Sequence, residues 1–373
     1  MSDAIDILPP DLIWPARTVS GRGAVETLTQ ECAGFGRRGI LLHGHSLVDG
    51  DHLSSIMAGC PPNVAVLPLC SPGGEPTLAE LDRLLGEARG HRPDWIAGVG
   101  GGSTMDLAKA IAGLLHTRGE LAEYHDGAPL DAPAIPFVAV PTTAGSGSEA
   151  TMVSVLINEA ATVKKSIRDP ALMARLVVLD PGLLSDCPAT VIAHSGMDAF
   201  VQAVEAYSSC KATWLSDRLA LQAIEMINGS IEAFYATPSS AAADAMLTAS
   251  YLTGLAFSFC RLGAVHGLAH PLGIRYRQAH GLVCAVCLPP ILAFNRPALG
   301  KKYEAMCAAV SDDLIERTVH LLACFGMRSP FAGADVVDRE AIVSETLASG
   351  STAANPRRVT EADANELLDA IFS

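Results

Sequence analysis

Short apolar runs alternate with segments of helical periodicity in the first half of the chain. Apolar and β-branched residues predict strands over 39–43, 64–69, 95–100, 137–141 and 176–180. Between them, segments such as 77–89 and 104–115 have apolar residues every three or four positions, which predicts helices. This alternation is typical of βαβ units and of a parallel sheet. We therefore expect an α/β domain with a Rossmann-like parallel sheet over residues 1–183.

The pattern changes after a strand-end turn at Asp180, Pro181 and Gly182. Nearly every later segment has helical spacing: 188–208, 213–236, 239–262, 280–294, 299–326 and 360–371. Residues 349–356 have the composition of a mobile loop. An all-α domain is expected over residues 184–373.

Composition limits the kinds of partner that the chain can have. Its 373 residues suit two domains, and with 49% apolar but only 5% aromatic residues the core must be mainly aliphatic. Asp and Glu number 40 against 26 Lys and Arg, a net charge of -14 without a basic cluster. Nucleic acid or an anionic membrane is therefore not expected as the principal partner.

No part of the sequence predicts export or a membrane span. Residues 1–15 carry no basic residue and no long apolar stretch, and the most apolar run, 246–260, is interrupted by polar residues and is too short to cross a bilayer. Ten scattered cysteines do not form a disulfide framework, and Cys284 and Cys287, a lone CxxC in an apolar segment, are assigned to core packing rather than to redox or zinc chemistry. The expected location is the cytoplasm.

A glycine-rich turn joins a predicted strand to a predicted helix. The sequence WIAGVGGGSTMDLAK, from Trp95 to Lys109, has three consecutive glycines at the turn. Glycines allow the backbone to approach a pyrophosphate, and the start of a helix offers backbone N–H groups and a positive dipole end. A dinucleotide phosphate suits this site, although such a turn alone can be simply tight.

A second polar loop follows another predicted strand. The sequence PTTAGSGSE, from Pro141 to Glu149, places hydroxyl groups at what should be the same edge of the sheet, where ligands gather in α/β folds. Alone, it could be only a polar loop. Together the strings GGGSxxDxAK and PTTxGSGSE resemble the iron-containing (group III) alcohol dehydrogenases, and the resemblance extends over most of the chain.

The resemblance implies a dehydroquinate synthase-like architecture and a bound NAD or NADP. The residues that it assigns to the cofactor are Gly100, Gly101, Gly102, Ser103 and Thr104 around the pyrophosphate, Asp106 on the helix that follows, Thr142 and Thr143 on the nicotinamide side, Lys165 near a ribose, and His45 at the end of the second strand. Lys165 could instead be a solvated charge on a strand edge. Many NAD-using relatives have Asp where His45 stands, so NADPH becomes compatible with the site.

Histidines gather in the second half of the chain. His266 and His270 lie four apart on one face of a helix, and His280 follows beyond a turn. Upstream, Asp198 and Gln202 are also four apart on a predicted helix. Imidazole nitrogen with carboxylate oxygen suits iron(II) or zinc, whereas any one of these histidines alone could be a core residue.

The resemblance implies that Asp198, His266 and His280 bind a divalent metal, with iron(II) expected and zinc as the alternative. The fourth ligand is normally His, and Gln202 occupies that position here, which would define a branch with Gln in place of one metal-binding His. His270 lies beside the substrate in the resembled family, and we expect it to relay a proton, although it could be purely structural. The alternative to a metal-binding site is a metal-free site like that of maleylacetate reductase relatives.

The expected function is metal-assisted hydride transfer between NAD(P)(H) and a small aldehyde, ketone or alcohol, in a cleft between the two halves. A non-redox enzyme resembling dehydroquinate synthase would need several cationic side chains near the motifs, which are scarce here. A non-catalytic family member is the remaining alternative. The N-terminal segment around residues 7–18 could pair with its symmetry mate, so a homodimer is expected.

Overall fold

Two compact units make up the chain in this computed structural model, which describes residues 6–49, 51–238 and 241–373. One unit is Ile13–Cys187, and the other is Pro188–Ser373 together with the described residues before Ile13. The backbone N–H groups of Trp214 and Leu215 donate to the carbonyl oxygens of Asp6 and Ile7, at 2.8 and 3.2 Å. The N-terminal segment therefore lies with the helical unit.

A six-stranded, all-parallel sheet forms the centre of the first unit, in the order β1-β8-β5-β4-β2-β3. Its strands are β1 (Thr18–Ser20), β2 (Arg38–His43), β3 (Ala65–Cys70), β4 (Trp95–Gly100), β5 (Phe137–Pro141) and β8 (Leu176–Leu179). Every residue of β4 and β5 is buried, as expected for central strands covered on both faces. The parallel α/β sheet predicted from the sequence is confirmed, and the N-terminal edge strand, expected around residues 7–18, is β1, which begins at Thr18.

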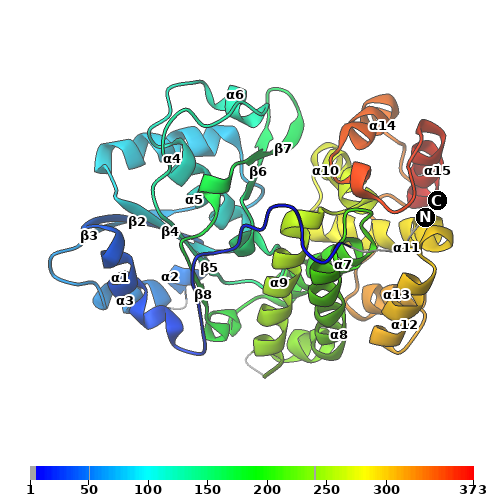
Figure 1. Ribbon diagram of the computed structural model, residues 1–373, viewed down its shortest axis with the longest axis horizontal. Coiled ribbons are helices and arrows are strands. Elements are labelled where there is room, and N and C mark those ends of the chain that lie inside the picture. The colour runs from blue at the N-terminus through cyan, green and yellow to red at the C-terminus, as the bar shows by residue number, and fades with distance from the viewer. Residues whose placement is uncertain (1–5, 50, 239–240) are drawn as a thin grey trace. The chain divides into compact units, whose positions relative to one another are not determined.

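Helices cover both faces of this sheet (Figure 1). On one face lie α4 (Leu78–His91) and α5 (Gly102–Leu114), and on the other α1 (Leu28–Cys32), α2 (Ser46–Asp49) and α3 (His52–Ala58). Helix α4 begins with a capping box, in which the Thr77 hydroxyl accepts from the backbone of Glu80 while the Glu80 carboxylate accepts from the backbone of Thr77. Its buried residues recur at helical spacing: Leu81, Leu84, Leu85 and Ala88.

An antiparallel hairpin lies between β5 and β8 in the chain and was not predicted. Strand β6 (Val153–Asn158) pairs with β7 (Val163–Arg168), and the short helix α6 (Leu121–His125) contacts both. The sequence of β7, VKKSIR, has only two apolar residues, so its pattern is too polar to be distinguished from a loop.

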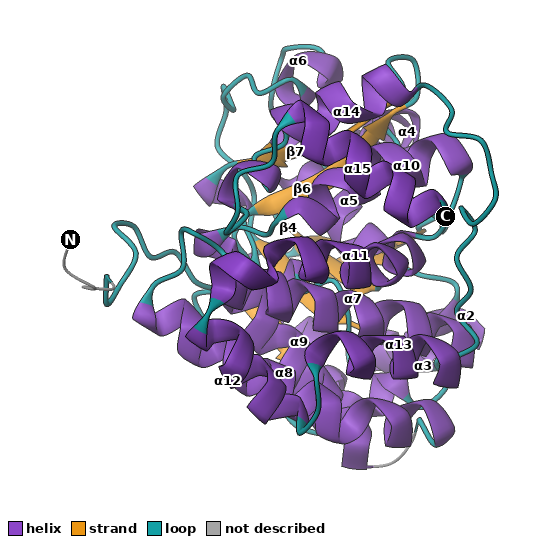
Figure 2. Ribbon diagram, turned by 90° about the vertical axis from the view of Figure 1, so that its right-hand side faces the viewer, coloured by secondary structure: helices purple, strands orange, loops and turns teal. Residues whose placement is uncertain are grey.

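The second unit is built from helices throughout its described residues (Figure 2). They are α7 (Ala189–Ser208), α8 (Trp214–Ala236), α9 (Ala241–Cys260), α10 (Ala264–Tyr276), α11 (His280–Leu299), α12 (Lys301–Val310), α13 (Leu314–Cys324), α14 (Arg339–Ala348) and α15 (Glu361–Phe372). Helix α7 is central, in contact with α8, α9 and α11. The all-helical second domain predicted from the sequence is confirmed.

Other details of this unit differ from the sequence prediction, and helix α14 was not among the predicted segments. The single helix expected over 299–326 is divided into α12 and α13, because Ser311 adopts a positive φ of 58° and Asp313 caps a new helix by accepting from the backbone of Ile315 at 3.0 Å. The expected loop over 349–356 contains a 3-10 turn at Thr352–Ala354 and is partly buried. Asn355 in it exchanges two side-chain hydrogen bonds with Asn295, at 3.0 and 2.7 Å.

Helix α11 is long and apolar enough to cross a membrane by length and composition alone, and α9 with α10 would qualify only as one span bent by 102°. Helix α11 packs against α7, α10, α13 and α15. Those contacts are what a core helix of a helical unit makes, and the same helix carries two side chains of the site described below.

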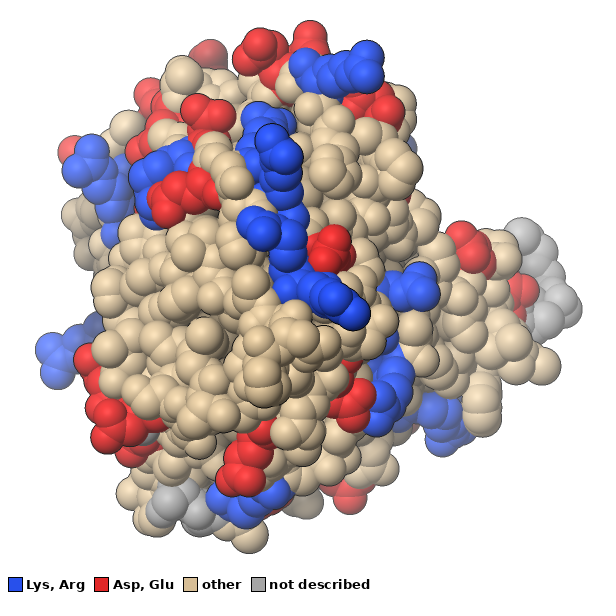
Figure 3. Space-filling model, turned by 90° about the vertical axis from the view of Figure 1, so that its left-hand side faces the viewer, with Lys and Arg blue, Asp and Glu red and all other residues tan. Residues whose placement is uncertain are grey.

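Charged side chains of both signs are interspersed on the molecular face shown in Figure 3, where a short band of basic residues has acidic residues beside it. Within the first unit, Arg17 forms an ion pair with Glu31 at 2.7 Å, and Arg83 pairs with Glu87. Exposed pairs of this kind add little stability, but they offset basic charge locally.

Candidate active site

The carboxyl ends of three neighbouring strands form one edge of the sheet. The backbone N–H of Gly44, after β2, donates to Val99 at 3.1 Å, and that of Thr142, after β5, donates to Gly100 at 3.0 Å. The order of the strands reverses between β2 and β4, since β3 lies on one side of β2 and β4, β5 and β8 lie on the other. Such a reversal is where α/β sheets bind ligands.

The glycine turn lies at this edge and needs its glycines for close packing. A Cβ on Gly100 would lie 2.6 Å from the Cβ of Thr104, and one on Gly102 would lie 2.7 Å from the Ser146 hydroxyl oxygen. Gly101 is the N-cap of α5, whose first backbone N–H groups have no acceptor within the helix. The turn brings this helix start directly against the second polar loop, and the start of a helix is a place where phosphates bind.

Asp106 and Lys109 join α5 to the second polar loop. The buried Asp106 carboxylate accepts from the Ser148 hydroxyl at 2.5 Å and from the backbone N–H of Val155 at 3.0 Å. The fully buried Lys109 ammonium donates to the Ser148 carbonyl and hydroxyl oxygens, at 2.8 and 2.9 Å, and to the carbonyl of Val153 at 2.6 Å. Both carboxylate oxygens of Asp106 therefore bond to other groups of the protein. Within the described residues, these bonds hold the second polar loop in place.

Burial shifts the pKa of the ionisable groups around this loop. It lowers the pKa of Lys109 to about 8, although the neighbouring carboxylates of Asp106 and Glu149 oppose the shift. It raises the pKa of Glu149 to about 7, against the influence of the Glu149 backbone N–H and of Lys109. The loop is thus held by polar groups withdrawn from water.

The other predicted cofactor residues lie at different depths. Thr142 is buried and Thr143 half-buried, whereas His45 is exposed at the end of β2 with the Cys70 thiol 3.6 Å from its Nδ1. Lys165 is half-exposed and pairs with Asp126 at 2.8 Å. Lys164 is the less exposed lysine of β7, with a side chain 8% exposed, and its ammonium lies 2.5 Å from the Glu75 carboxylate.

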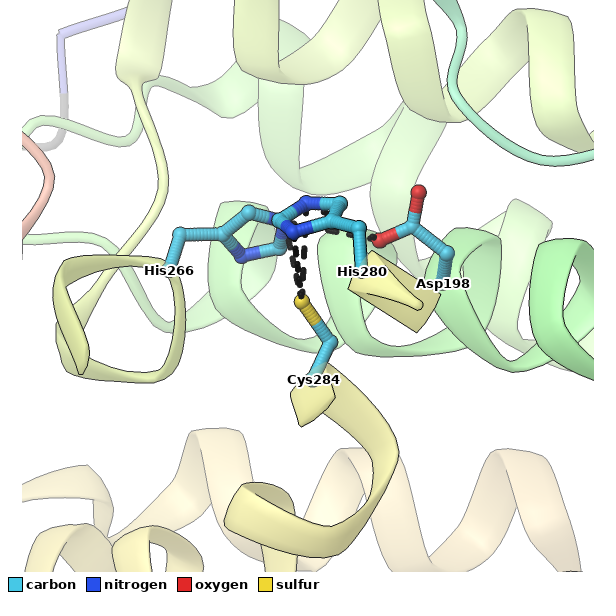
Figure 4. A group of neighbouring side chains, drawn as sticks. All are labelled: Asp198, His266, His280 and Cys284. Carbon is cyan, nitrogen blue, oxygen red and sulfur yellow. Dashed lines mark hydrogen bonds and ion pairs between the residues drawn. The ribbon is translucent and has the colours of Figure 1, made fainter. Parts of the chain in front are cut away.

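A cluster of ligand atoms lies in the helical unit. Asp198 comes from α7, His266 from α10, and His280 and Cys284 from the first turns of α11, and Figure 4 shows the four side chains directed toward one another. One ligand atom from each lies within 4.8 Å of all the others. Nε2 of His266 is 3.5 Å and Nε2 of His280 is 3.9 Å from Asp198 Oδ1. Three residues predicted to share a metal are therefore brought together.

Glu205 orients one of the imidazoles. From the same helix as Asp198, its Oε2 lies 2.6 Å from His266 Nδ1, while its Oε1 accepts from the backbone N–H of Val265 at 2.7 Å. When the imidazole is neutral, a proton shared with this carboxylate leaves Nε2 with the lone pair that a metal ion needs. Burial opposes a charge on His266, but the Cys284 sulfur and the carboxylates of Glu205 and Asp198 raise the pKa of His266 well above its ordinary value.

Gln202 and His270 adjoin the cluster. The Gln202 amide nitrogen donates to Asp198 Oδ2 at 3.0 Å, and its buried carbonyl oxygen has no hydrogen-bond partner among the described residues. The His270 ring centroid is 6.4 Å from that of His266 and 5.5 Å from that of His280. His270 thus lies next to the ligand atoms without being one of the four that meet.

The donor set fits a divalent metal. Ligands about 2.0–2.3 Å from a tetrahedral ion lie roughly 3.3–3.8 Å from one another. The distances from Asp198 to the two imidazoles, 3.5 and 3.9 Å, are close to that spacing. A buried carboxylate, two imidazoles and a carboxylate-bound Nδ1 are the elements of a metal site with an oriented histidine.

Sequence reasoning did not find Cys284 or Glu205 as members of this site. The CxxC of Cys284 and Cys287 lies in an apolar helix and was assigned to core packing. Within the described contacts this assignment holds for Cys287. It does not account for Cys284, whose sulfur lies beside two histidines. Glu205 follows Asp198 by seven residues, two helical turns, and this spacing was the available signal.

Together, the fold and the site define a class of protein. A parallel sheet of the kind that binds dinucleotides is joined in one chain to a helical unit that carries a metal-type cluster, the group Asp198, His266, His280 and Cys284. Comparison with known families identifies it further. Residues 15–181 match the model of iron-containing alcohol dehydrogenase, and residues 192–372 match the model of the C-terminal part of the Fe-containing alcohol dehydrogenase family. The chain is 34% identical to the probable alcohol dehydrogenase EutG of Escherichia coli K12 over 311 residues, 80% of this chain and 78% of that protein.

Solved structures agree with this assignment. The fold matches the crystal structure of a 1,3-propanediol oxidoreductase with a TM-score of 0.90 and 28% identity, over 97% of this chain and 99% of the other. It also matches sulfoacetaldehyde reductase from Bifidobacterium kashiwanohense in complex with NAD+, with a TM-score of 0.88 and 25% identity, over 97% and 98% of the two chains. The chain belongs to the iron-containing alcohol dehydrogenase family, and it is an oxidoreductase of the alcohol dehydrogenase and aldehyde reductase class.

Proposed function

We propose that the chain interconverts a small aldehyde or ketone and its alcohol with NAD(H) or NADP(H), using a divalent metal held by Asp198, His266 and His280. The observation that carries this proposal is the convergence of these three side chains from three helices, within 4.8 Å of one another. When bound, such an ion polarises the substrate oxygen and stabilises the negative charge that develops on it.

The residues of the chain have separate tasks in this reaction. Asp198 supplies negative charge to the ion, and Glu205 keeps His266 in the tautomer whose Nε2 can bind it. His270, beside the cluster, is the group proposed to pass a proton between the substrate oxygen and solvent. Gln202, in the position where the family normally has His, is proposed to mark a branch of the family.

The cofactor is proposed to bind at the edge of the sheet. Gly100, Gly101, Gly102, Ser103 and Thr104 would hold the pyrophosphate at the start of α5, and Thr142 and Thr143 would line the nicotinamide side. Asp106 would act through the loop that it fixes. His45 and Lys165 are proposed to lie near the riboses, where the absence of a carboxylate at His45 removes repulsion toward a 2'-phosphate.

The direct test is the absorbance of NADH and NADPH in the presence of a panel of small aldehydes, with zinc-loaded, iron(II)-loaded and chelator-treated protein. We expect turnover that is lost on metal removal and restored by one of the two ions. The Asp198→Asn variant should lose both turnover and bound metal, while Lys165→Met should bind metal normally. Turnover unchanged after complete metal removal would favour the maleylacetate reductase type of mechanism and end the Lewis-acid proposal.

A homodimer and a reducing compartment are proposed on separate grounds. Strand β1 is an edge of the sheet, and exposed apolar side chains precede it: Ile7, Leu8, Leu12 and Trp14. All ten cysteines are free thiols, which supports the cytoplasm. Light scattering of the parent and of a Trp14→Glu variant tests the dimer; a parent that is monomeric at micromolar concentration would refute it.

A further inference from the structure

A buried thiol occupies a corner of the metal-type cluster. Cys284 lies one helical turn after His280 on α11 and is inaccessible to solvent. Its Sγ is 3.7 Å from Nε2 of His266 and 3.6 Å from Nε2 of His280 (Figure 4). A thiolate and an imidazole on one tetrahedral zinc ion are separated by roughly 3.6 Å, from metal–ligand distances of about 2.3 and 2.0–2.1 Å. The sulfur is thus at ligand spacing from both imidazoles.

Gln202, by contrast, is oriented toward another residue. Its amide nitrogen donates to Asp198 Oδ2, which leaves Oδ1 facing the two imidazoles. Exchanging the amide nitrogen and oxygen by rotation would place two oxygens 3.0 Å apart, with no proton between them. The amide nitrogen therefore holds Asp198 in its observed orientation.

Building on the proposed function, we propose that Cys284, as a thiolate, is the fourth protein ligand of the metal, taking the part that an imidazole plays in the family, and that this donor makes the site prefer zinc to iron(II). Formation of the metal–sulfur bond releases the thiol proton to solvent and changes no oxidation state. Soft thiolate ligands favour zinc, whereas carboxylate and imidazole ligands alone discriminate less. Gln202 is a positioning residue for Asp198.

Cobalt(II) is a suitable probe, because a cobalt–thiolate bond gives a charge-transfer absorption band in the near ultraviolet. One background must be removed first: Glu232, His320 and Cys324 form an exposed group whose ligand atoms also lie within 4.8 Å of one another. All measurements therefore use the full chain with Cys324→Ser. Cys287→Ala is the matched control for Cys284→Ala, since both remove a buried thiol from the same helix, three residues apart.

We expect one equivalent of cobalt(II) and the charge-transfer band in the Cys324→Ser protein and in its Cys287→Ala derivative. The Cys284→Ala derivative should lose the band and should bind zinc at least about tenfold more weakly, with a smaller loss for iron(II). A Gln202→Ala derivative should keep the band. Loss of the band with Gln202→Ala but not with Cys284→Ala, or its absence from the Cys324→Ser protein, would overturn the proposal.

X-ray absorption at the zinc edge checks the ligand without any change at Cys284. The zinc-loaded Cys324→Ser protein should show one sulfur neighbour at about 2.3 Å, and only nitrogen and oxygen neighbours would overturn the proposal. Failure of the proposed function is a different result: a sulfur-ligated ion in a protein that turns over no aldehyde would refute the reductase and leave the ligand assignment intact.

Discussion

Replacing Glu205 by Gln tests whether the carboxylate behind His266 prepares the metal site. Glu205 accepts two hydrogen bonds, from His266 Nδ1 at 2.6 Å and from the backbone of Val265 at 2.7 Å. An amide has a single acceptor oxygen. If that oxygen keeps the Val265 bond, the NH2 group faces Nδ1 and drives the imidazole proton to Nε2, the nitrogen that must bind the ion.

The expected loss can be estimated from this arrangement. Removing the partner of a metal-binding histidine lowers metal affinity by about 10- to 100-fold, or about 1.4–2.8 kcal/mol. Competition for zinc against a chromophoric chelator measures this loss directly. Asn355→Ala is the control, because Asn355 accepts from the backbone of Ala264 at 3.1 Å, at the same helix start, and does not contact the imidazole.

The control should lower thermal stability and leave zinc affinity within about threefold of the parent. Glu205→Gln should lower zinc affinity in a protein that remains folded by circular dichroism. Equal zinc affinity in Glu205→Gln and the parent would refute the orienting role of the carboxylate. An equal loss in both variants would assign the effect to the helix start rather than to the tautomer.

Three further predictions concern the sheet unit. His45→Asp should lower the preference for NADPH over NADH by at least about tenfold in competing fluorescence titrations, since like charges at close range cost several kcal/mol; an unchanged ratio would place the 2'-position elsewhere. Gly100→Ala adds a methyl group 2.6 Å from the Cβ of Thr104 and should raise the dissociation constant for NADH while zinc content stays constant, with about 1–3 kcal/mol of lost stability; tight NADH binding would contradict this. In the folded protein the pKa of Glu149 is about 7, above its ordinary value of 4.5. Its protonated form therefore contributes stability that is present below about pH 4.5 and is lost as the pH rises through 7. The free energy of unfolding in denaturant, measured at pH 5 and pH 7, should change less with pH in Glu149→Gln than in the parent.

Much of the fold could be predicted because its central elements carry strong patterns. Strands β4 and β5 are continuous apolar runs, and α4 combines a capping box with buried residues at helical spacing. The hairpin of β6 and β7 could not be predicted in the same way. Its second strand is polar, and its register depends on tertiary contacts such as the bond from Val155 to Asp106.

Only part of the metal-type cluster could be predicted from the sequence. Helical spacing placed His266 and His270 on one face, but it gave no means of choosing which of the two meets Asp198. The resemblance to a family made that choice. Cys284 lies four residues after His280, a spacing that places both on one helix face, but its neighbours in sequence are apolar and its approach to His266 depends on how α11 packs against α10.

The bonds from Asp106 and Lys109 to the loop at Ser148 have a consequence for coenzyme binding. They hold two segments that are about forty residues apart in the chain as one piece, without any help from a ligand. A dinucleotide that binds there does not have to order a flexible loop, so the loss of chain entropy offsets little of its interaction energy. Shortening or grafting either segment alone would break this arrangement, and specificity engineering in this protein should exchange the two together.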